Sequence, residues 1–387
     1  MSKAARYRYR IEPNAEQRQM LARQFGCVRY VYNWALGMKS EAFRERAEKI
    51  SYAETDKRLT QLKREPKTEW LQEVSSVPLQ QALRHLDKAY TAFFSGNARF
   101  PRFKAKRHRQ SATYTKRGFS LKDSGTPGQP LVTLAKTSAP LKVRWSRPLP
   151  SAPSSLTVIL EPDGNYYVSF VVEVNPEPLP RTKRSVGIDL GLNDVVVTSD
   201  GWHSGNPKHL RKAQDRLALE QRRLAKKVKG SANWHKQRRR VAKLHQKVSN
   251  QRRDFLHQLS TRLVRRYDFI ACESLNVKGM AKNHSLAQAI SDAGWNTFVG
   301  MLGYKAEWYG KTLVQIDRWY PSSKTCSNCG HTLETLPLGV RRWTCPECEA
   351  EHQRDVNAAK NILAVGHTVS ASGLGVRPPL ALVSGGG

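Results

Sequence analysis

The stretch Ser185-Val-Gly-Ile-Asp-Leu-Gly191 predicts a short buried strand that ends in a carboxylate, Asp189. An ionised acid is costly to bury unless a metal ion or a cation pairs with it. Asp189 is therefore a candidate ligand or catalytic residue, although one acid at a strand end does not fix the chemistry.

Two further acids stand at the ends of predicted strands or helices. Glu273 follows the apolar run Phe269–Cys272, and Asp355 opens a predicted helix. Each has an ordinary explanation, because such an acid can cap a turn or favour a helix dipole. Together they predict one site at a common edge. Clustered carboxylates stay ionised only with cations between them, so we expect Mg2+ or Mn2+ there. Two ions about 4 Å apart, sharing Asp189, would activate water for phosphodiester hydrolysis.

Four of the six cysteines form two Cys-x2-Cys pairs separated by 15 residues. They are Cys326, Cys329, Cys345 and Cys348. This spacing is typical of a zinc ribbon, and four thiolate ligands leave no open position, so the Zn2+ should be structural. His331 and His352 lie near the cysteines but are not needed to complete the zinc site. Cys27 and Cys272 lie in apolar surroundings and are predicted core residues.

Asp194–Thr198 and Thr312–Ile316 predict two further strands, and the alternation of strands with helices around these acids predicts an α/β unit. Residues 208–266 predict a helical hairpin with a break at Gly230, and they contain 20 Lys/Arg against 3 Asp/Glu. So one-sided an excess favours contact with a phosphate backbone. Residues 4–11 predict a strand, and residues 16–25 and 28–43 predict two helical stretches that are interrupted near Gly26. Residues 78–94 predict a helix with one apolar stripe of Leu79, Leu83, Leu86 and Tyr90. Short β-rich runs separated by Gly, Pro and Ser fill residues 111–174, and Asp163-Gly164 predicts a hairpin turn between the runs 156–160 and 166–174.

The whole chain of 387 residues has a formal charge of +33, which indicates a polyanionic partner such as nucleic acid. No segment approaches the ~20 apolar residues of a membrane span. The segment Met1–Pro13 is basic and lacks the apolar region of a secretory signal. The cysteine usage fits a metal-binding intracellular protein.

The motifs resemble the TnpB proteins of bacterial insertion sequences, which are related to type V CRISPR effector nucleases. The marks are Gly26–Trp34, Phe100–Phe103, Gly187–Gly191, Glu273–Met280, Ser322–Gly330 and Asp355–Ile362. The resemblance implies an α/β fold with a β-barrel and a helical lobe, and a RuvC (RNase H-like) nuclease domain with an inserted zinc ribbon. It implies a wedge-like barrel at 1–12 and 110–180, a recognition lobe at 13–109, nuclease segments at 181–320 and 354–366, and the ribbon at 321–353. The composition of residues 367–387, rich in Gly, Ser and Pro, predicts a disordered tail.

The resemblance also implies function. The chain would be a transposon-encoded, RNA-guided DNA endonuclease that cuts guide-complementary double-stranded DNA next to a short motif. Asp189, Glu273 and Asp355 match the catalytic positions of the family. We expect a guide RNA partner, a monomeric ribonucleoprotein, no membrane partner, and a cytoplasmic, nucleoid-associated location. Three departures from the family pattern are Ser274, Glu349 and Gln353, and Glu349 would be strained if its φ is positive.

Several alternatives stay open. A nuclease-silent, RNA-guided DNA-binding regulator would share this scaffold, but all three acids argue against it. A DDE transposase would share the nuclease core, but the third acid there is Glu and no ribbon precedes it. The string Gly187–Gly191 also occurs in actin-like ATPases, yet no second phosphate loop follows. A plain zinc-stabilised nucleic-acid-binding protein would leave the three acids unexplained.

Overall fold

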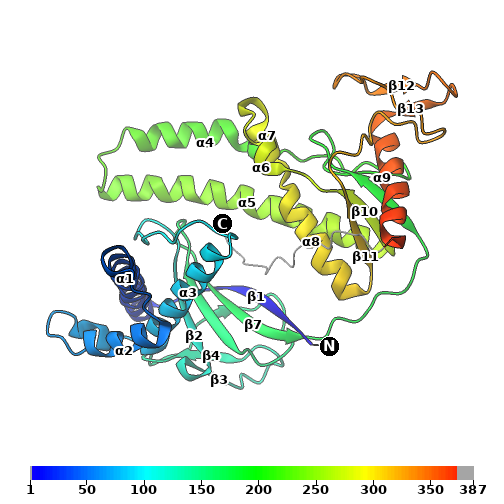
Figure 1. Cartoon of the computed structure of the whole chain (residues 1–387). Coiled ribbons are helices and arrows are strands. Elements are labelled where there is room, and N and C mark those ends of the chain that lie inside the picture. Colours follow the sequence, from blue (N-terminus) through cyan, green and yellow to red (C-terminus); the bar gives the residue numbers. More distant parts are fainter. Residues whose placement is uncertain (1, 373–387) are drawn as a thin grey trace. The chain divides into compact units, whose positions relative to one another are not determined.

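The computed structural model describes residues 2–372, which fall into two compact units that divide between Asn175 and Pro176 (Figure 1). Each unit has its own sheet and its own helices, and each is described by itself. In the described part of the chain, no helix is both long and apolar enough to cross a membrane.

The first unit is built on a five-stranded antiparallel sheet in the order β2-β6-β7-β1-β5. Its strands are β1 (Lys3–Ile11), β2 (Gln110–Thr115), β5 (Val143–Arg144), β6 (Ser155–Leu160) and β7 (Tyr166–Val174). The turn between β6 and β7 is at Gly164, whose φ of 88° suits glycine, as the sequence predicted. Two further strands, β3 (Phe119–Lys122) and β4 (Leu131–Leu134), follow β2 in the sequence and pair with each other as a separate two-stranded sheet. No described pairing joins β5 to β2, so the structure supports the antiparallel sheet but not a closed barrel.

The helices of the first unit are α1 (Ala15–Arg46), α2 (Tyr52–Leu62) and α3 (Ser76–Phe94), with two short 3-10 turns, η1 (Glu69–Gln72) and η2 (Lys116–Gly118). Asn14 and Gln17 form a capping box that starts α1. The sequence predicted an interruption near Gly26, but α1 runs through it as one helix. Helix α2 was not predicted, although the Ser51 side chain caps its first turn. The predicted stripe of Leu79, Leu83 and Leu86 is buried, as expected for α3.

The second unit has a four-stranded sheet in the order β11-β10-β8-β9. The strands are β8 (Ser185–Asp189), β9 (Val197–Thr198), β10 (Phe269–Glu273) and β11 (Thr312–Ile316). β10 runs parallel to both β8 and β11, whereas β9 is antiparallel to β8. The sequence predicted all four strands, although β9 is shorter than expected and His203 pairs with Val197 at its outer side.

Two long helices, α4 (His209–Ala225) and α5 (Ala232–Arg266), lie side by side and form the predicted hairpin (Figure 1). They are joined at Gly230, which has a φ of 88°. The other helices are α6 (Val277–Met280), α7 (His284–Ala293), α8 (Trp295–Tyr309) and α9 (Arg354–Ala371). Before α9, β12 (Arg342–Thr344) pairs with β13 (Glu351–Gln353) in the cysteine-rich segment.

The prediction that a disordered tail begins at residue 367 is wrong for its first residues, because α9 continues to Ala371. The helix continues because the sheet still lies beneath it. Gly366 lies against Ala271, and the ring of His367 stacks on that of Phe269 with centroids 4.4 Å apart. Residues 373–387 of that expected tail lie outside the described residues.

Candidate nuclease site and zinc ribbon

Asp189 and Glu273 end two neighbouring parallel strands. In the register of β8 and β10, Ile188 pairs with Cys272, so the two acids follow at the same edge of the sheet. Ile188 and Cys272 are buried in the core that α5 and α8 cover. Because side chains alternate along a strand, Asp189 and Glu273 face the opposite side, where α9 lies.

Asp355 lies in the first turn of α9, which packs closely on that side. A Cβ added to Gly187 would stand only 1.9 Å from the carbonyl oxygen of Ala359, so glycine is required for this approach. Gly366 approaches Ala271 in the same way further along the helix. These two contacts orient α9 with its first turn toward the strand ends, and so place Asp355 beside Asp189.

The three acids interact electrostatically. Burial raises the pKa of Asp189 to about 7, and the carboxylates of Glu273 and Asp355 raise it too, against Arg354 and Arg341. Burial also raises the pKa of Glu273, although the Ser322 hydroxyl, which donates to it, acts in the opposite direction. Three neighbouring carboxylates repel one another when they are ionised. Hard divalent cations prefer such oxygen ligands and neutralise their negative charge.

The three acids are not packed as tightly as the ligands of one ion. In residues 2–372, the only group of at least three His, Cys, Asp or Glu ligand atoms within 4.8 Å of one another is the four-cysteine cluster. The structure thus brings the three predicted acids to one edge without closing them around a single point.

Several residues at this edge were not predicted. Ser322 donates to Glu273, and Arg341 Nη1 lies 3.4 Å from Asp355 Oδ1. The side chains of Asn357 and Asn361 are buried and donate to the carbonyl oxygen of Thr325, at 2.7 and 2.6 Å. These amides tie α9 to the loop that carries Ser322. The sequence signal was only the presence of two asparagines four residues apart, which share one helix face.

A second group of polar side chains, centred on His203, lies beside β9 and contacts the start of α9. His203 Nδ1 lies 3.0 Å from Asp194 Oδ2, and His203 Nε2 lies 3.4 Å from the side-chain amide of Gln353. Gln353 caps α9 by accepting from the backbone N–H of Val356. His203 therefore contacts the residue that starts the helix bearing Asp355.

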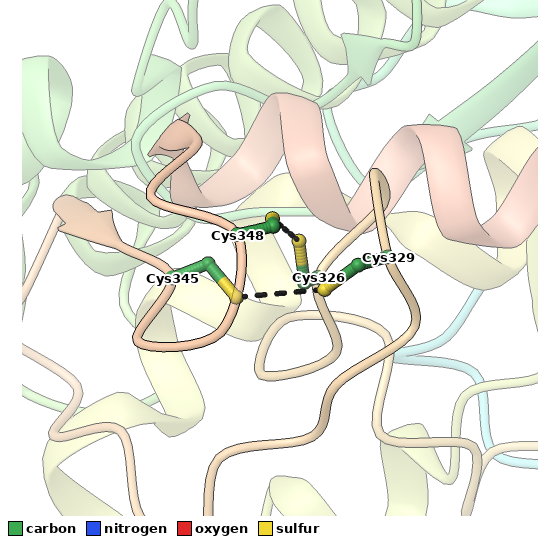
Figure 2. A group of neighbouring side chains, drawn as sticks. All are labelled: Cys326, Cys329, Cys345 and Cys348. Carbon is green, nitrogen blue, oxygen red and sulfur yellow. Dashed lines mark hydrogen bonds between the residues drawn. The ribbon is translucent and has the colours of Figure 1, made fainter.

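The four cysteines converge as predicted (Figure 2). The sulphur atoms lie 3.6 Å apart in both the Cys326–Cys348 and the Cys329–Cys345 pairs. Tetrahedral Zn–S bonds of about 2.3 Å require sulphur atoms about 3.8 Å apart, so the cluster fits Zn2+. Asn328 donates from its side chain to Cys348, which lowers the pKa of that thiol to about 6.

His352 was predicted to be unnecessary for the cluster, and it supplies no ligand atom to the group of four. Its ring is buried against Trp343, and Nε2 lies 3.0 Å from Cys326 Sγ. An imidazole N–H at this place stabilises a metal-bound thiolate from outside the ligand set.

The residues after the two knuckles have left-handed backbones. Gly330 has a φ of 84° and Glu349 a φ of 53°, so the strain anticipated at Glu349 is present. A residue with a Cβ costs about 1–2 kcal/mol in this region.

We expect Glu349→Gly to raise the free energy of unfolding of the zinc-bound protein by about 1 kcal/mol, and Gly330→Ala to lower it similarly. Thermal unfolding at fixed zinc would measure both, and an unchanged Glu349→Gly midpoint would count against strain.

The chain matches three family models. They are IS605 OrfB, described as "Probable transposase", over residues 169–284, a "Cas12f1-like, TNB domain" over residues 295–362, and a "Helix-turn-helix domain" over residues 1–48. The last description differs from the structure, where residues 1–48 contain β1 and the single helix α1.

Two relatives align over nearly the whole chain. One from Streptomyces pristinaespiralis, named "Putative RNA-guided DNA endonuclease", is 48% identical over 96% of this chain and 92% of its own length. One from Escherichia coli (strain K12), named "Putative RNA-guided DNA endonuclease InsQ", is 32% identical over 96% of this chain and 95% of its own length.

Among solved structures, the chain resembles Cas12f1 from a cryo-EM complex with sgRNA and target DNA. The TM-score is 0.51 at 12% sequence identity, and the match covers 94% of this chain and 98% of that chain. At this identity the likeness concerns the fold alone, and the fold is Cas12f1-like.

Proposed function

Because the chain belongs to the TnpB (IS605 OrfB) family, we propose that it is a transposon-encoded, RNA-guided DNA endonuclease. It binds a guide RNA and cleaves double-stranded DNA that is complementary to the guide, next to a short motif. The near-full-length match to relatives bearing this name supports the assignment. The observation that supports the chemistry is geometric: β8 and β10 end side by side in Asp189 and Glu273, and α9, which begins with Asp355, packs on the same face of the sheet.

The catalytic residues of this proposal are Asp189, Glu273 and Asp355. Their oxygen donors suit Mg2+ or Mn2+, which would supply charge and Lewis acidity for hydrolysis of a phosphodiester. Ser322 orients Glu273 through its hydroxyl, and Arg341 holds Asp355 from the outside. Helix α9 keeps Asp355 at a fixed distance from the strands, because glycine contacts set its position.

We assign the second unit to a RuvC-type, RNase H-like nuclease domain with a structural zinc ribbon inserted before its last helix. The strand order β11-β10-β8-β9, with β9 antiparallel, supports this assignment. The four cysteines would hold Zn2+ as a closed site without a free position. The first unit would then supply the wedge-like segments, residues 1–12 and 110–180, and the recognition lobe, residues 13–109.

The test is cleavage by protein purified from cells that carry its native locus. We expect a specific RNA to copurify, and sequencing of that RNA to define the complementary DNA that is cut in Mg2+. Brief treatment with EDTA should stop cutting while the more tightly held zinc remains bound. Cutting that persists in excess EDTA would contradict the metal-dependent mechanism.

Two competing functions predict different results in the same assay. A nuclease-silent regulator would bind RNA and matching DNA but leave the DNA intact at every metal concentration. A DDE-type transposase would join DNA strands without any RNA. Cutting that requires both RNA and complementarity excludes both.

A further inference from the structure

A hollow of about 420 Å3 lies between α4 and α5, near the turn that joins them. Seven residues line it: Arg223, Lys226, Lys227, Asn233, Lys236, Gln237 and Arg240. Five of the seven are cations and none is an acid. The hollow belongs wholly to the second unit and is separate from the carboxylate edge.

The positive charge of the hollow is largely uncompensated. Glu220 at its margin accepts from Arg223 Nη1 at 2.9 Å and also from the side-chain amide of Gln237. In the described part of the chain, no ion pair joins Lys226, Lys227 or Lys236 to a carboxylate. Grouped cations repel one another, so the free protein holds this cluster at a cost that a bound anion removes.

The hollow is also preformed. Gln237 is only 5% exposed, and its amide bridges from α5 to the carbonyl oxygen of Glu220 on α4 at 3.0 Å. Ser231 caps α5 at the start of the same wall by accepting from Trp234. The two helices therefore hold the cations in place before any ligand arrives.

We propose that this hollow binds successive phosphate groups of a nucleic-acid backbone and reads charge rather than base identity. The proposal rests on the proposed function for its biological partner. Charged and amide side chains make up the lining, so the negative charge of a ligand is the main feature that the hollow recognises. Its volume falls within the range of about 300–1,000 Å3 that small ligands occupy, which is sufficient for a nucleotide-sized unit.

The test variant is the triple substitution Lys226→Gln, Lys227→Gln and Lys236→Gln, which removes three charges. Lys226 and Lys227 follow the end of α4, and glutamine keeps the helix propensity of Lys236 within α5. The probes are a single-stranded RNA and a duplex DNA, each of about 30 units, titrated at several salt concentrations. We expect at least a tenfold weaker affinity at physiological salt. The slope of log affinity against log salt should fall by about 2–3, the value for three lost phosphate contacts.

The matched control is Lys212→Gln, Lys243→Gln and Lys247→Gln. These exposed lysines lie on the same two helices outside the hollow, so the change in net charge is identical. We expect less than a threefold loss of affinity from the control. Equal losses in the two triple variants, or no loss in either, would overturn the proposal, because binding would then depend on total charge alone or avoid this face.

The two probes identify the source of the phosphates. A loss confined to the RNA arm assigns the hollow to the guide, a loss confined to the DNA arm assigns it to the target, and a loss in both assigns it to either backbone. Because the probes need no guide sequence, the result is independent of cleavage. If the wild type proves not to cut RNA-matched DNA but the hollow variant still loses affinity, the proposed function fails and the phosphate site stands.

Discussion

Replacing Asp189 by asparagine is expected to abolish DNA cleavage, by more than about a thousandfold. The amide keeps the size of the side chain but cannot neutralise a divalent cation. The several kcal/mol of charge stabilisation that bound ions give to phosphodiester hydrolysis would therefore be lost. Cleavage rates with saturating RNA and target DNA would measure the effect. RNA and target binding should stay within a few fold of the wild type, and a parallel loss of binding would show that Asp189 serves folding instead.

The same substitution should stabilise the protein without added Mg2+. The pKa of Asp189 is raised from 3.8 to about 7, so between these values the folded state keeps a proton that the unfolded state has lost. Stability contributed by this group thus falls as pH rises from about 4 to about 7, and asparagine escapes that penalty. We expect equal melting temperatures near pH 4 and a higher one for the variant at pH 8. An equal or lower melting temperature at pH 8 would argue against the buried, repelled carboxyl.

Gly187→Ala is expected to lower the free energy of unfolding by about 3 kcal/mol and cleavage by about a hundredfold. The added Cβ would meet the carbonyl oxygen of Ala359 at 1.9 Å and the backbone nitrogen of Leu363 at 2.7 Å. Neither neighbour is a flexible side chain, so α9 must move away from the sheet. Asp355 would move with it, and a displacement of about 1 Å at reacting groups costs roughly a hundredfold in rate.

Gly300→Ala is the matched control. Gly300 lies within α8 with no atom within 4 Å of the position of its missing Cβ. Alanine there should stabilise the helix by about 0.5–1 kcal/mol and leave cleavage unchanged. Chemical denaturation and cleavage assays of both variants separate a close-packing effect from a general effect of glycine replacement. A Gly187→Ala protein as stable and active as the control would refute the close packing of α9.

The sequence predicted the elements whose causes are local. The apolar runs before Asp189 and Glu273 predict strands, and the regular spacing of leucines predicts α3 and the hairpin helices. The cysteine spacing predicts the metal cluster because each Cys-x2-Cys pair supplies two thiolates, and four thiolates complete the tetrahedral coordination of one Zn2+. The catalytic roles of the three acids stay predictions until cleavage is measured.

What escaped prediction depends on contacts between distant segments. The serine that reaches Glu273 comes from a loop 49 residues later in the chain. The continuation of α9 past residue 366 depends on the Phe269 ring beneath it, which no local pattern reveals. Helix α1 runs through Gly26 because nothing near that position requires a break.

The ribbon leaves and rejoins the second unit at neighbouring points. On the way out, the backbone N–H of Ser327 donates to Asn357; on the way back, Gln353 caps the same helix. The segment between Cys329 and Cys345 also returns to this helix, because Arg341 Nη1 lies 3.4 Å from Asp355 Oδ1 and the carbonyl oxygen of Arg341 accepts from the backbone N–H of Arg354. A change of length in the ribbon is therefore compatible with the site during evolution only where it leaves Arg341 beside the start of α9.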